Sequence, residues 1–432
     1  MFVSENLSVN EKGNLTIGGV DTIDLVNQYG TPLYVLDKDL IRKNCKKFVK
    51  SINKHYDGNG LVCYASKALS CKEIYRIMKD EGLGVDTVSI GEMYTALSVG
   101  FPAEKIYFHG NNKADEELKF ALENKIGRIV VDNLQELKRL SELAVKLGVV
   151  ASIMLRVKPG IDAHTHDFIR TGQIDSKFGF AIETNEALEA AKCVVDSKNI
   201  NLVGAHCHIG SQILDVDPFM LAAEVMIDYI NDVKNSTSVT MSELNLGGGF
   251  GIKYTSNDDP VDYENYMEPV SEVLNKKCSD YGIKTPFIVI EPGRSLIGPA
   301  GITLYKVGAR KEIPNIRTYI SVDGGMTDNP RYALYKSKYD ALVANKANLE
   351  KTDVVTIAGK CCESGDLIGE NIKLQHAEAG DIIAICATGA YNYSMSSNYN
   401  RILKPPIVMV SGGKSRVVVK RETLKDLVRN DI

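Results

Sequence analysis

Lys67 is the residue in this chain with the clearest capacity for chemistry. It closes an apolar run, residues 61–67 (LVCYASK), and a helical pattern starts directly after it. Burying an ammonium group is costly unless it has a partner or a function, and α/β enzymes build active sites at the carboxyl ends of parallel strands. A desolvated lysine there can form a Schiff base with a carbonyl compound. The alternative is a lysine that extends its charge into solvent, and Lys67 alone leaves both open.

Three other apolar runs end in residues that can do chemistry, and among them the glycines, Ser211 and Arg294 could bind an anion. Their last residues are His206, His208 and Ser211 in the first, Gly247, Gly248 and Gly249 in the second, and Glu291, Gly293 and Arg294 in the third. Glycine lets backbone N–H groups approach an anion closely. The triple glycine matches neither a P-loop nor GxGxxG, so nucleotide binding is not indicated. A glycine run alone also makes plain turns, but the loops after the last two strands of a barrel commonly bind phosphate.

A Schiff-base lysine together with a phosphate site suggests pyridoxal phosphate. This cofactor needs a partner for its ring nitrogen, and Glu291 is the candidate, with a surface ion pair to Arg294 as the alternative. His208 can lie against the ring, although a single histidine in a strand is more often a core residue.

The elements that position these residues form one repeating series. Apolar strand-like runs alternate with amphipathic helical segments from Leu61 to about Arg294. Continuous Val, Ile and Leu runs are typical of parallel strands covered on both faces. Eight such units predict a (β/α)₈ barrel, with a doubly wound sheet as the second choice. The predicted strands are 61–67, 84–89, 106–111, 128–133, 151–159, 202–210, 243–249 and 287–294.

Helix signals support this series. Ser89 and Asn133 are each followed three residues later by glutamate, which indicates helix starts. Leucines at 134, 137, 140, 143 and 147 predict a stripe that covers the sheet, and Gly148 predicts the helix end.

The flanks predict a second, all-β domain built as a barrel or sandwich. Short β runs separated by Gly, Pro and Asp follow residue 294, at 301–309, 317–322, 353–358, 381–387 and 407–410. We expect an N-terminal strand segment (1–35) that joins this domain, a cofactor-binding barrel (36–298) and the C-terminal β domain (299–432). Residues 160–182 predict a long connection after the fifth strand, and long loops at this end of a barrel are often functional.

Composition excludes several functional classes. The chain has 432 residues, 44% hydrophobic and 25% charged, with a net charge of −4, so a basic nucleic-acid surface is not expected. No apolar stretch approaches the length of a membrane span, and the N-terminus lacks the pattern of a signal peptide. Nine scattered cysteines indicate reduced thiols, as in a cytoplasmic protein. No metal site is expected.

Six segments in order along nearly the whole chain resemble one family. They are YASK (64–67), HCHIGS (206–211), GGG (247–249), EPGR (291–294), CESGD (362–366) and residues 389–400. On these motifs the chain resembles the diaminopimelate decarboxylases, within the alanine racemase/ornithine decarboxylase-like (fold type III) pyridoxal phosphate enzymes. The resemblance implies the barrel plus a β domain, and a head-to-tail homodimer with shared active sites. Thr388 and Asn392 depart from positions where relatives often have glycine.

The resemblance also implies roles for single residues. Lys67 would carry the cofactor covalently, His208 would stack on its ring and Glu291 would bind its ring nitrogen. Cys362 would be the proton donor and would enter the neighbouring subunit's site. The phosphate would be held by Ser211, Gly247, Gly248, Gly249, Gly293, Arg294 and Tyr391, and the substrate by Arg294, Arg331, Tyr335, Glu363 and Tyr391. Without the motif, Cys362 beside Cys361 would be read as a buried inert thiol.

The implied reaction is decarboxylation of meso-2,6-diaminopimelate to L-lysine and CO₂, the last step of lysine biosynthesis. Relatives that act on ornithine or arginine typically have Asp after the cysteine, whereas this chain has Glu363. Arg294 and Arg331 can bind the substrate's distal carboxylate, because the arginine fork is bidentate. A basic amino-acid or carboxylated-polyamine decarboxylase, an amino-acid racemase on the same fold and a non-catalytic cofactor-binding protein are the alternatives.

Overall fold

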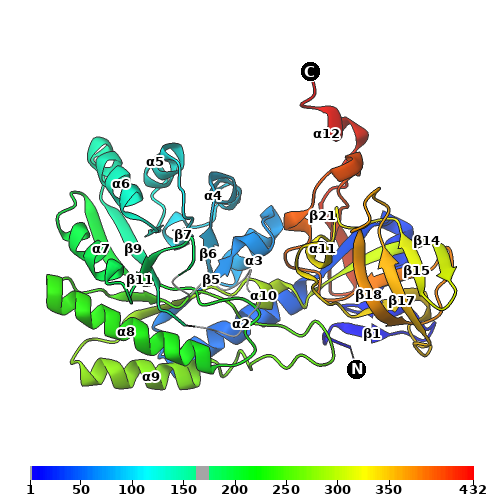
Figure 1. Cartoon of the computed structure of the whole chain (residues 1–432), viewed down its shortest axis with the longest axis horizontal. Coiled ribbons are helices and arrows are strands. Elements are labelled where there is room, and N and C mark those ends of the chain that lie inside the picture. Colours follow the sequence, from blue (N-terminus) through cyan, green and yellow to red (C-terminus); the bar gives the residue numbers. More distant parts are fainter. Residues whose placement is uncertain (1, 162–174) are drawn as a thin grey trace. The chain divides into compact units, whose positions relative to one another are not determined.

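Eight parallel strands close into a barrel in the middle of the chain (Figure 1). The structure is a computed structural model and describes residues 2–161 and 175–432. Neighbouring strands pair in chain order and the last pairs with the first, which confirms the predicted (β/α)₈ closure. The strands are β5 (Gly60–Ala65), β6 (Gly84–Thr87), β7 (Ile106–Phe108), β8 (Arg128–Val131), β9 (Ala151–Lys158), β11 (Ile200–His206), β12 (Glu243–Asn245) and β13 (Phe287–Ile290).

The barrel interior is apolar, as the continuous hydrophobic runs predict. Cys63, Tyr107, Val130, Met154 and Val289 form one buried cluster from five strands. Most strands end a few residues earlier than predicted, because the polar residues at their carboxyl ends turn away from the ladder. The candidate site residues therefore lie largely in the loops that follow the strands.

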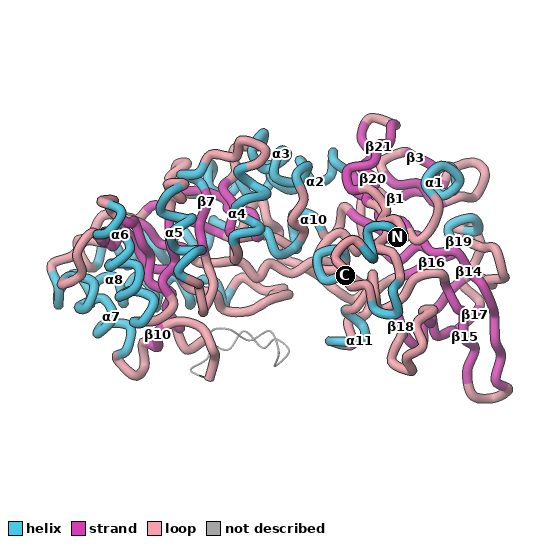
Figure 2. Tube along the Cα trace, turned by 90° about the horizontal axis from the view of Figure 1, so that it is seen from above, coloured by secondary structure: helices cyan, strands magenta, loops and turns pink. Residues whose placement is uncertain are grey.

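Helices surround the barrel strands (Figure 1; Figure 2). They are α3 (Lys72–Asp80), α4 (Ile90–Leu97), α5 (Asp115–Glu123), α6 (Leu134–Leu147), α7 (Glu186–Val195), α8 (Asp217–Thr237) and α9 (Met267–Asp280), and α2 (Lys38–His55) precedes β5.

Helix α6 begins and ends where the sequence predicts. The Asn133 side chain accepts a hydrogen bond from the Glu136 amide (2.9 Å), and Gly148 ends the helix with φ +67°. The leucine stripe is only partly right, because Leu134 is 42% exposed while Leu137 and Leu140 are buried. Residues spaced by three drift around a helix of 3.6 residues per turn. The buried set therefore continues from Leu140 to Ala144 and leaves the later leucines partly exposed.

A second compact unit carries the β domain. Unit 1 comprises Met1–Asn44, Ile252–Asp259 and Arg294–Ile432, and unit 2, the barrel unit, comprises Cys45–Gly251 and Pro260–Gly293. The sheet of unit 1 has the order β18-β17-β15-β14-β4-β20-β21, and β19 pairs with β14 and β16. Its strands are β4 (Leu33–Asp37), β14 (Gly301–Ile313), β15 (Arg317–Val322), β16 (Ala341–Val343), β17 (Asp353–Ala358), β18 (Leu367–Leu374), β19 (Ile382–Ile385), β20 (Ile407–Ser411) and β21 (Lys414–Val419).

The N-terminal segment contributes more than one strand to unit 1. A small antiparallel sheet, β1 (Leu7–Val9), β2 (Leu15–Ile17) and β3 (Val20–Asp21), precedes α1 (Thr22–Tyr29), and β4 lies between β14 and β20. Two apolar clusters form the core of this unit. A separate β-sheet domain is thus confirmed, whereas the exact domain limits 1–35, 36–298 and 299–432 stay a prediction.

The predicted loop 160–182 is described only at its ends, since residues 162–174 lie outside the described residues. Near its end β10 (Phe180–Ala181) pairs in parallel with Val157 and Lys158 of β9, a short strand that the sequence did not predict. All nine cysteines are free thiols. Among the described helices, none combines the length and the apolarity needed to cross a membrane.

Candidate active site

Glu291 lies at the centre of a buried polar cluster at the carboxyl ends of four barrel strands. It follows β13 directly and is 5% exposed. Its Oε1 accepts a hydrogen bond from Asn245 Nδ2 (2.6 Å) and lies 2.9 Å from His109 Nε2. Its Oε2 accepts one from His206 Nε2 (3.2 Å). Both carboxylate oxygens therefore have donors, and a surface ion pair, the alternative for Glu291, is excluded by its burial.

The electrostatics of this cluster favour a fixed negative charge. Burial lowers the pKa of His206 to about 4, so this imidazole is neutral near pH 7 and donates through Nε2. Burial alone would raise the pKa of Glu291, but His109 and His206 lower it well below its usual range. Glu291 is thus ionised inside the barrel mouth.

His109, His206 and Glu291 also have the donor set of a transition-metal site. One ligand atom of each lies within 4.8 Å of the others, and two histidines with a carboxylate are a common zinc set. The Asn245 amide (2.6 Å) and the His206 imidazole (3.2 Å) donate hydrogen bonds to the carboxylate, and His109 Nε2 lies 2.9 Å from it without the geometry of a hydrogen bond. We therefore assign the cluster to holding the carboxylate.

Lys67 lies in a 3₁₀ turn, η1 (Ser66–Ala68), directly after β5, and it is exposed. Of the two alternatives for Lys67, the structure shows the exposed lysine, because the strand ends at Ala65 and the chain turns there. Within the described parts of the chain its amine has no hydrogen-bond or ion-pair partner, although the charges of Asp86 and Glu92 are near enough to interact with it. The amine is available to react.

His208 is held in one tautomer by the glycine run. Its Nδ1 accepts a hydrogen bond from the Gly248 amide (3.2 Å). Burial and the charge of Lys67 lower the pKa of His208 well below its usual range, so the ring is neutral. Its protonated nitrogen is therefore Nε2.

The triple glycine is required by close backbone packing. A Cβ atom on Gly248 would lie 2.1 Å from the Glu291 carbonyl oxygen, and Gly247 has φ +68°. The Gly247 amide donates to Asn245 Oδ1 (2.8 Å), and that of Gly248 to His208. The N–H groups of Gly247 and Gly248 thus bind within the protein, and the role of the three glycines in holding a phosphate stays a prediction.

Unit 1 carries a cluster of arginine and tyrosine side chains. Arg294, the first residue of α10 (Arg294–Ile297), is buried and donates to the Tyr254 hydroxyl (2.5 Å). Its guanidinium lies 4.7 Å from the ring centre of Tyr391. That of Arg331, in α11 (Arg331–Tyr335), lies 5.6 Å from the same ring and 5.3 Å from Tyr335. Tyr391 thus contacts both guanidinium groups.

The CESGD motif forms a loop after β17 in unit 1. Cys362 and Glu363 are exposed, which excludes a buried inert thiol at Cys362. The side chain of Asp366 is buried beneath the loop and accepts hydrogen bonds from the amides of Met326 (2.6 Å) and Cys361 (2.7 Å). Asp366 therefore fixes the loop that presents the two exposed side chains.

The predicted site residues fall into two groups, one in each unit. Unit 2 carries Lys67, His208, Ser211, Gly247, Gly248, Gly249, Glu291 and Gly293, and unit 1 carries Arg294, Arg331, Tyr335, Cys362, Glu363 and Tyr391. From the sequence, His206 was named only as a residue at a strand end, and His109, Asn245 and Tyr254 were not identified. The first three are polar residues at strand ends, and that position is the signal that could have found them.

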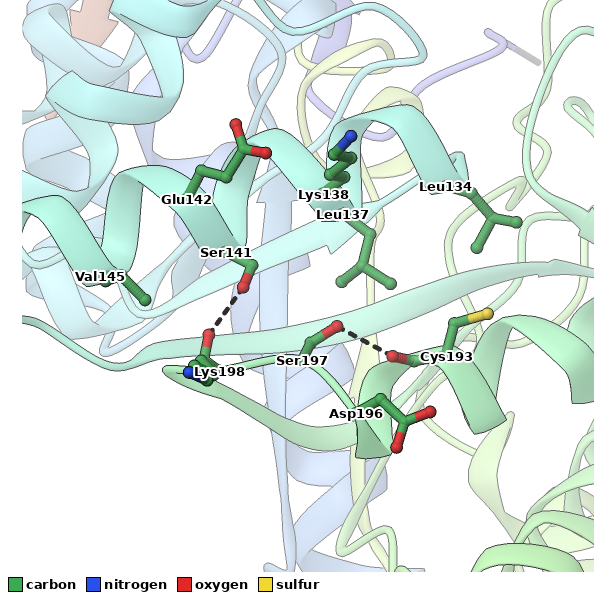
Figure 3. Close-up of a pocket in the computed structure, with 10 residues that line it drawn as sticks. All are labelled: Leu134, Leu137, Lys138, Ser141, Glu142, Val145, Cys193, Asp196, Ser197 and Lys198. Carbon is green, nitrogen blue, oxygen red and sulfur yellow. Dashed lines mark hydrogen bonds between the residues drawn. The ribbon is translucent and has the colours of Figure 1, made fainter.

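A separate cavity of about 660 Å³ lies on the outside of the barrel between α6 and the segment that ends α7 (Figure 3). Leu134, Leu137 and Val145 of α6 and Cys193 and Asp196 of the facing segment are among the residues that line it. No predicted site residue lines it.

The donor set of unit 2 fits pyridoxal phosphate. It offers an exposed amine, an ionised buried carboxylate and a neutral imidazole. These three groups suit the carbonyl, the ring nitrogen and the ring face of this cofactor. The family model for the pyridoxal-dependent decarboxylases, pyridoxal binding domain, matches residues 38–298. The chain belongs to the pyridoxal-dependent decarboxylases.

Within the pyridoxal-dependent decarboxylases, the relatives are diaminopimelate decarboxylases. That of Bacillus subtilis (strain 168) is 49% identical over 435 residues, which cover 100% of this chain and 98% of that protein. The solved M. jannaschii diaminopimelate decarboxylase, in complex with L-lysine, has a TM-score of 0.93 at 34% identity and covers 100% of this chain and 99% of that one. The Helicobacter pylori enzyme, also with L-lysine, has a TM-score of 0.86 at 32% identity, with coverage of 95% and 98%. The chain is thus a pyridoxal phosphate enzyme of this decarboxylase family, as its motifs predict.

Proposed function

We propose that this chain decarboxylates meso-2,6-diaminopimelate at its D-centre and releases L-lysine and CO₂, the last step of lysine biosynthesis. The observation that carries the proposal is the 49% identity to the Bacillus subtilis diaminopimelate decarboxylase over the full chain. The L-lysine in two related structures is the product that this reaction would give.

The residues of unit 2 would hold the cofactor. Lys67 binds it covalently through its amine, neutral His208 lies against the ring, and ionised Glu291 accepts a hydrogen bond from the ring nitrogen. The phosphate is bound by Ser211, Gly247, Gly248, Gly249, Gly293, Arg294 and Tyr391; at Gly247 and Gly248 the contribution is the missing side chain, because their amides bind within the protein. Bound pyridoxal phosphate withdraws the electron pair of the bond that breaks when the carboxylate leaves.

The residues of unit 1 would bind the substrate and supply a proton. Arg294, Arg331, Tyr335, Glu363 and Tyr391 bind the distal amino acid: guanidinium groups bind its carboxylate, and Glu363 binds its ammonium. Once CO₂ has left, the Cys362 thiol or the Lys67 ammonium would give the α-carbon a proton, so that a C–H bond replaces the bond to the carboxylate. The exposure of Cys362 and Glu363 on a loop fixed by Asp366 supports their use as a pair.

The active unit would be a head-to-tail homodimer in the cytoplasm. Cys362 and Glu363 would serve the neighbouring subunit's site, and nine free cysteines suit a reducing compartment. Light scattering would give the mass. Mixing Lys67→Ala with Cys362→Ala should restore part of the activity that each variant lacks, because one mixed site would then be intact. Activity that stays lost in verified mixed dimers would contradict shared sites.

The decisive test is CO₂ release by the pyridoxal phosphate-loaded protein, with the amine product identified. The panel would be meso-diaminopimelate, L-ornithine, L-arginine, L-lysine and carboxyspermidine. Lysine from the first compound alone is the expected result. CO₂ from another member would keep the reaction and overturn the roles of Glu363 and Arg331, and no CO₂ from a protein that holds its cofactor would favour a racemase or a non-catalytic protein. Lys67→Ala should lose the covalent bond to the cofactor.

A further inference from the structure

Two buried histidines beside Glu291 have no role in the proposed reaction so far. His109 directly follows β7 and is 4% exposed, and His206 is the last residue of β11 and is 1% exposed. Their rings meet edge to face with centroids 4.8 Å apart. Because each ring has a nitrogen within 3.2 Å of a different Glu291 oxygen, their effect on this carboxylate is direct.

The Glu291 carboxylate has room for its neighbours and for one further hydrogen-bond donor. A carboxylate has about four acceptor positions. Asn245, His206 and His109 occupy or face three of them, which leaves one for an additional N–H group. Asn245 and His206 are themselves paired across the β11–β12 ladder, so the barrel backbone sets the positions of two donors.

A buried carboxylate without donors becomes protonated, because burial disfavours the charged form. A protonated Glu291 would not accept a proton from a ring N–H group. The two imidazoles lower the pKa of Glu291 well below its usual range in spite of its burial. By lowering the pKa of Glu291, the two histidines favour the state in which the proton of a hydrogen bond between Glu291 and a ring N–H group stays on the ring nitrogen.

We propose that His109 and His206 are positioning residues that keep Glu291 ionised and in one orientation, so that the ring nitrogen of bound pyridoxal phosphate stays protonated. This inference rests on the role proposed above for Glu291. His206 acts as a neutral Nε2–H donor, and its buried Nδ1 has no hydrogen-bond partner in the described part of the chain. His109 contributes from the other oxygen.

Other charged groups around the pair come from neighbouring strands. Asp86 on β6 is buried, which raises its pKa, while His109 opposes that shift. Arg156 on β9 interacts with Asp132 as well as with Glu291 and Asp86. The charge of Lys67 and the buried thiols of Cys63 and Cys207 also lie near enough to interact with groups of this cluster. The near polar contacts of the Glu291 carboxylate within the described residues are the two histidines and Asn245.

The test reads the ring nitrogen itself. Protein loaded with pyridoxal phosphate that is ¹⁵N-labelled in the ring is compared by NMR in wild type, His109→Leu, His206→Leu, His206→Gln and Glu291→Gln, with the exposed His376→Leu as control. We expect the pyridinium signal in wild type and in the control. The signal should move toward the neutral pyridine position in both histidine-to-leucine variants. His206→Gln keeps an N–H donor, so its signal should stay closer to the pyridinium position than that of His206→Leu.

Two outcomes separate the inference from the function on which it rests. If Glu291→Gln loses the pyridinium signal and the leucine variants keep it in full, the histidines have no positioning role. If Glu291→Gln also keeps it, the role proposed for Glu291 itself is wrong.

A second measurement needs no variant and so remains decisive if the leucine variants do not fold. In histidine-labelled wild-type apo-protein, His206 should be the neutral Nε2–H tautomer and should not titrate above about pH 5, because its pKa is about 4. A cationic or Nδ1–H His206 at neutral pH would overturn the inference.

Discussion

Asp366 offers a sharp test of how the exposed Cys362 and Glu363 are positioned. Its buried carboxylate accepts the amides of Met326 at 2.6 Å and Cys361 at 2.7 Å. Cβ atoms on Gly325 or Gly359 would come within 2.4 Å of the same carboxylate, so the backbone is packed closely around it. Asp366→Ala would leave both amides without an acceptor in a space too crowded for easy rearrangement.

The free-energy cost of Asp366→Ala follows from the loss of these two hydrogen bonds. A hydrogen bond to a charged group contributes about 1.5–3 kcal/mol, so the pair stabilises the closed loop by about 3–6 kcal/mol. Because about 1.4 kcal/mol is a factor of ten in an equilibrium constant, the loop should open at least about a hundredfold more often in Asp366→Ala. Asp366→Asn keeps one acceptor oxygen and should lie between wild type and Ala.

Amide hydrogen exchange at Met326 and Cys361 measures this opening directly. Exchange at both amides should accelerate by about a hundredfold or more, and kcat/KM for meso-diaminopimelate should fall while cofactor binding is retained. Glu350→Gln, an exposed acid before β17, is the matched control and should change neither readout. Unchanged exchange in a folded Asp366→Ala protein would refute the reasoning, because the loop would then be held by other contacts.

Three further predictions follow from single sites. Lys113 and Glu136 form an ion pair in which both side chains are 0% exposed and Nζ lies 2.7 Å from Oε1. Glu136→Leu should lower the free energy of unfolding, measured in urea, by about 3–5 kcal/mol, because it leaves a buried charge without a partner. Lys113→Met combined with Glu136→Leu should recover most of the lost stability. Equal losses in the single and double variants would contradict this. Cys362→Ala should lower kcat and leave the absorbance of the bound cofactor unchanged; loss of the cofactor would indicate a structural role instead. Burial raises the pKa of Asp328 to about 7, above the unfolded value of about 4. The folded state therefore binds the proton more tightly, and the stability contributed by this group is lost as pH rises from about 4 to 7. Asp328→Asn should flatten the pH dependence of the unfolding free energy between these values, and an unchanged profile would contradict the prediction.

The barrel was predictable because its signal is local. Most strands lie in short runs rich in apolar residues, and their length distinguishes them from the helices. The ends of strands were less predictable, because the sequence does not show the difference between the ladder pairing of β13, which stops at Ile290, and the single backbone hydrogen bonds that Glu291 and Pro292 make after it. The burial of Glu291 and the exposure of Lys67 depend on that difference.

The contacts of the site could not be derived from the sequence. The sequence indicated Glu291 as a candidate, but its partner His109 is far away in the chain and becomes a neighbour only when the barrel closes. Similarly, the glycine run suggested an anion site, whereas the structure uses two of its amides for Asn245 and His208. In the β domain, β16, β18 and β21 escaped prediction because their runs are short or mostly polar.

The position of β4 has a consequence for how the chain is made. This strand comes early, yet it pairs with β14 on one side and β20 on the other. During synthesis one edge of β4 stays unpaired until β14 has left the ribosome, and the other stays unpaired until residues of β20, near the end of the chain, have done so. All the strands of the barrel are complete long before that point. An unpaired strand edge is a template for association with other chains, so the nascent protein carries this hazard for most of its synthesis, and a chain that stops short of β20 keeps it permanently.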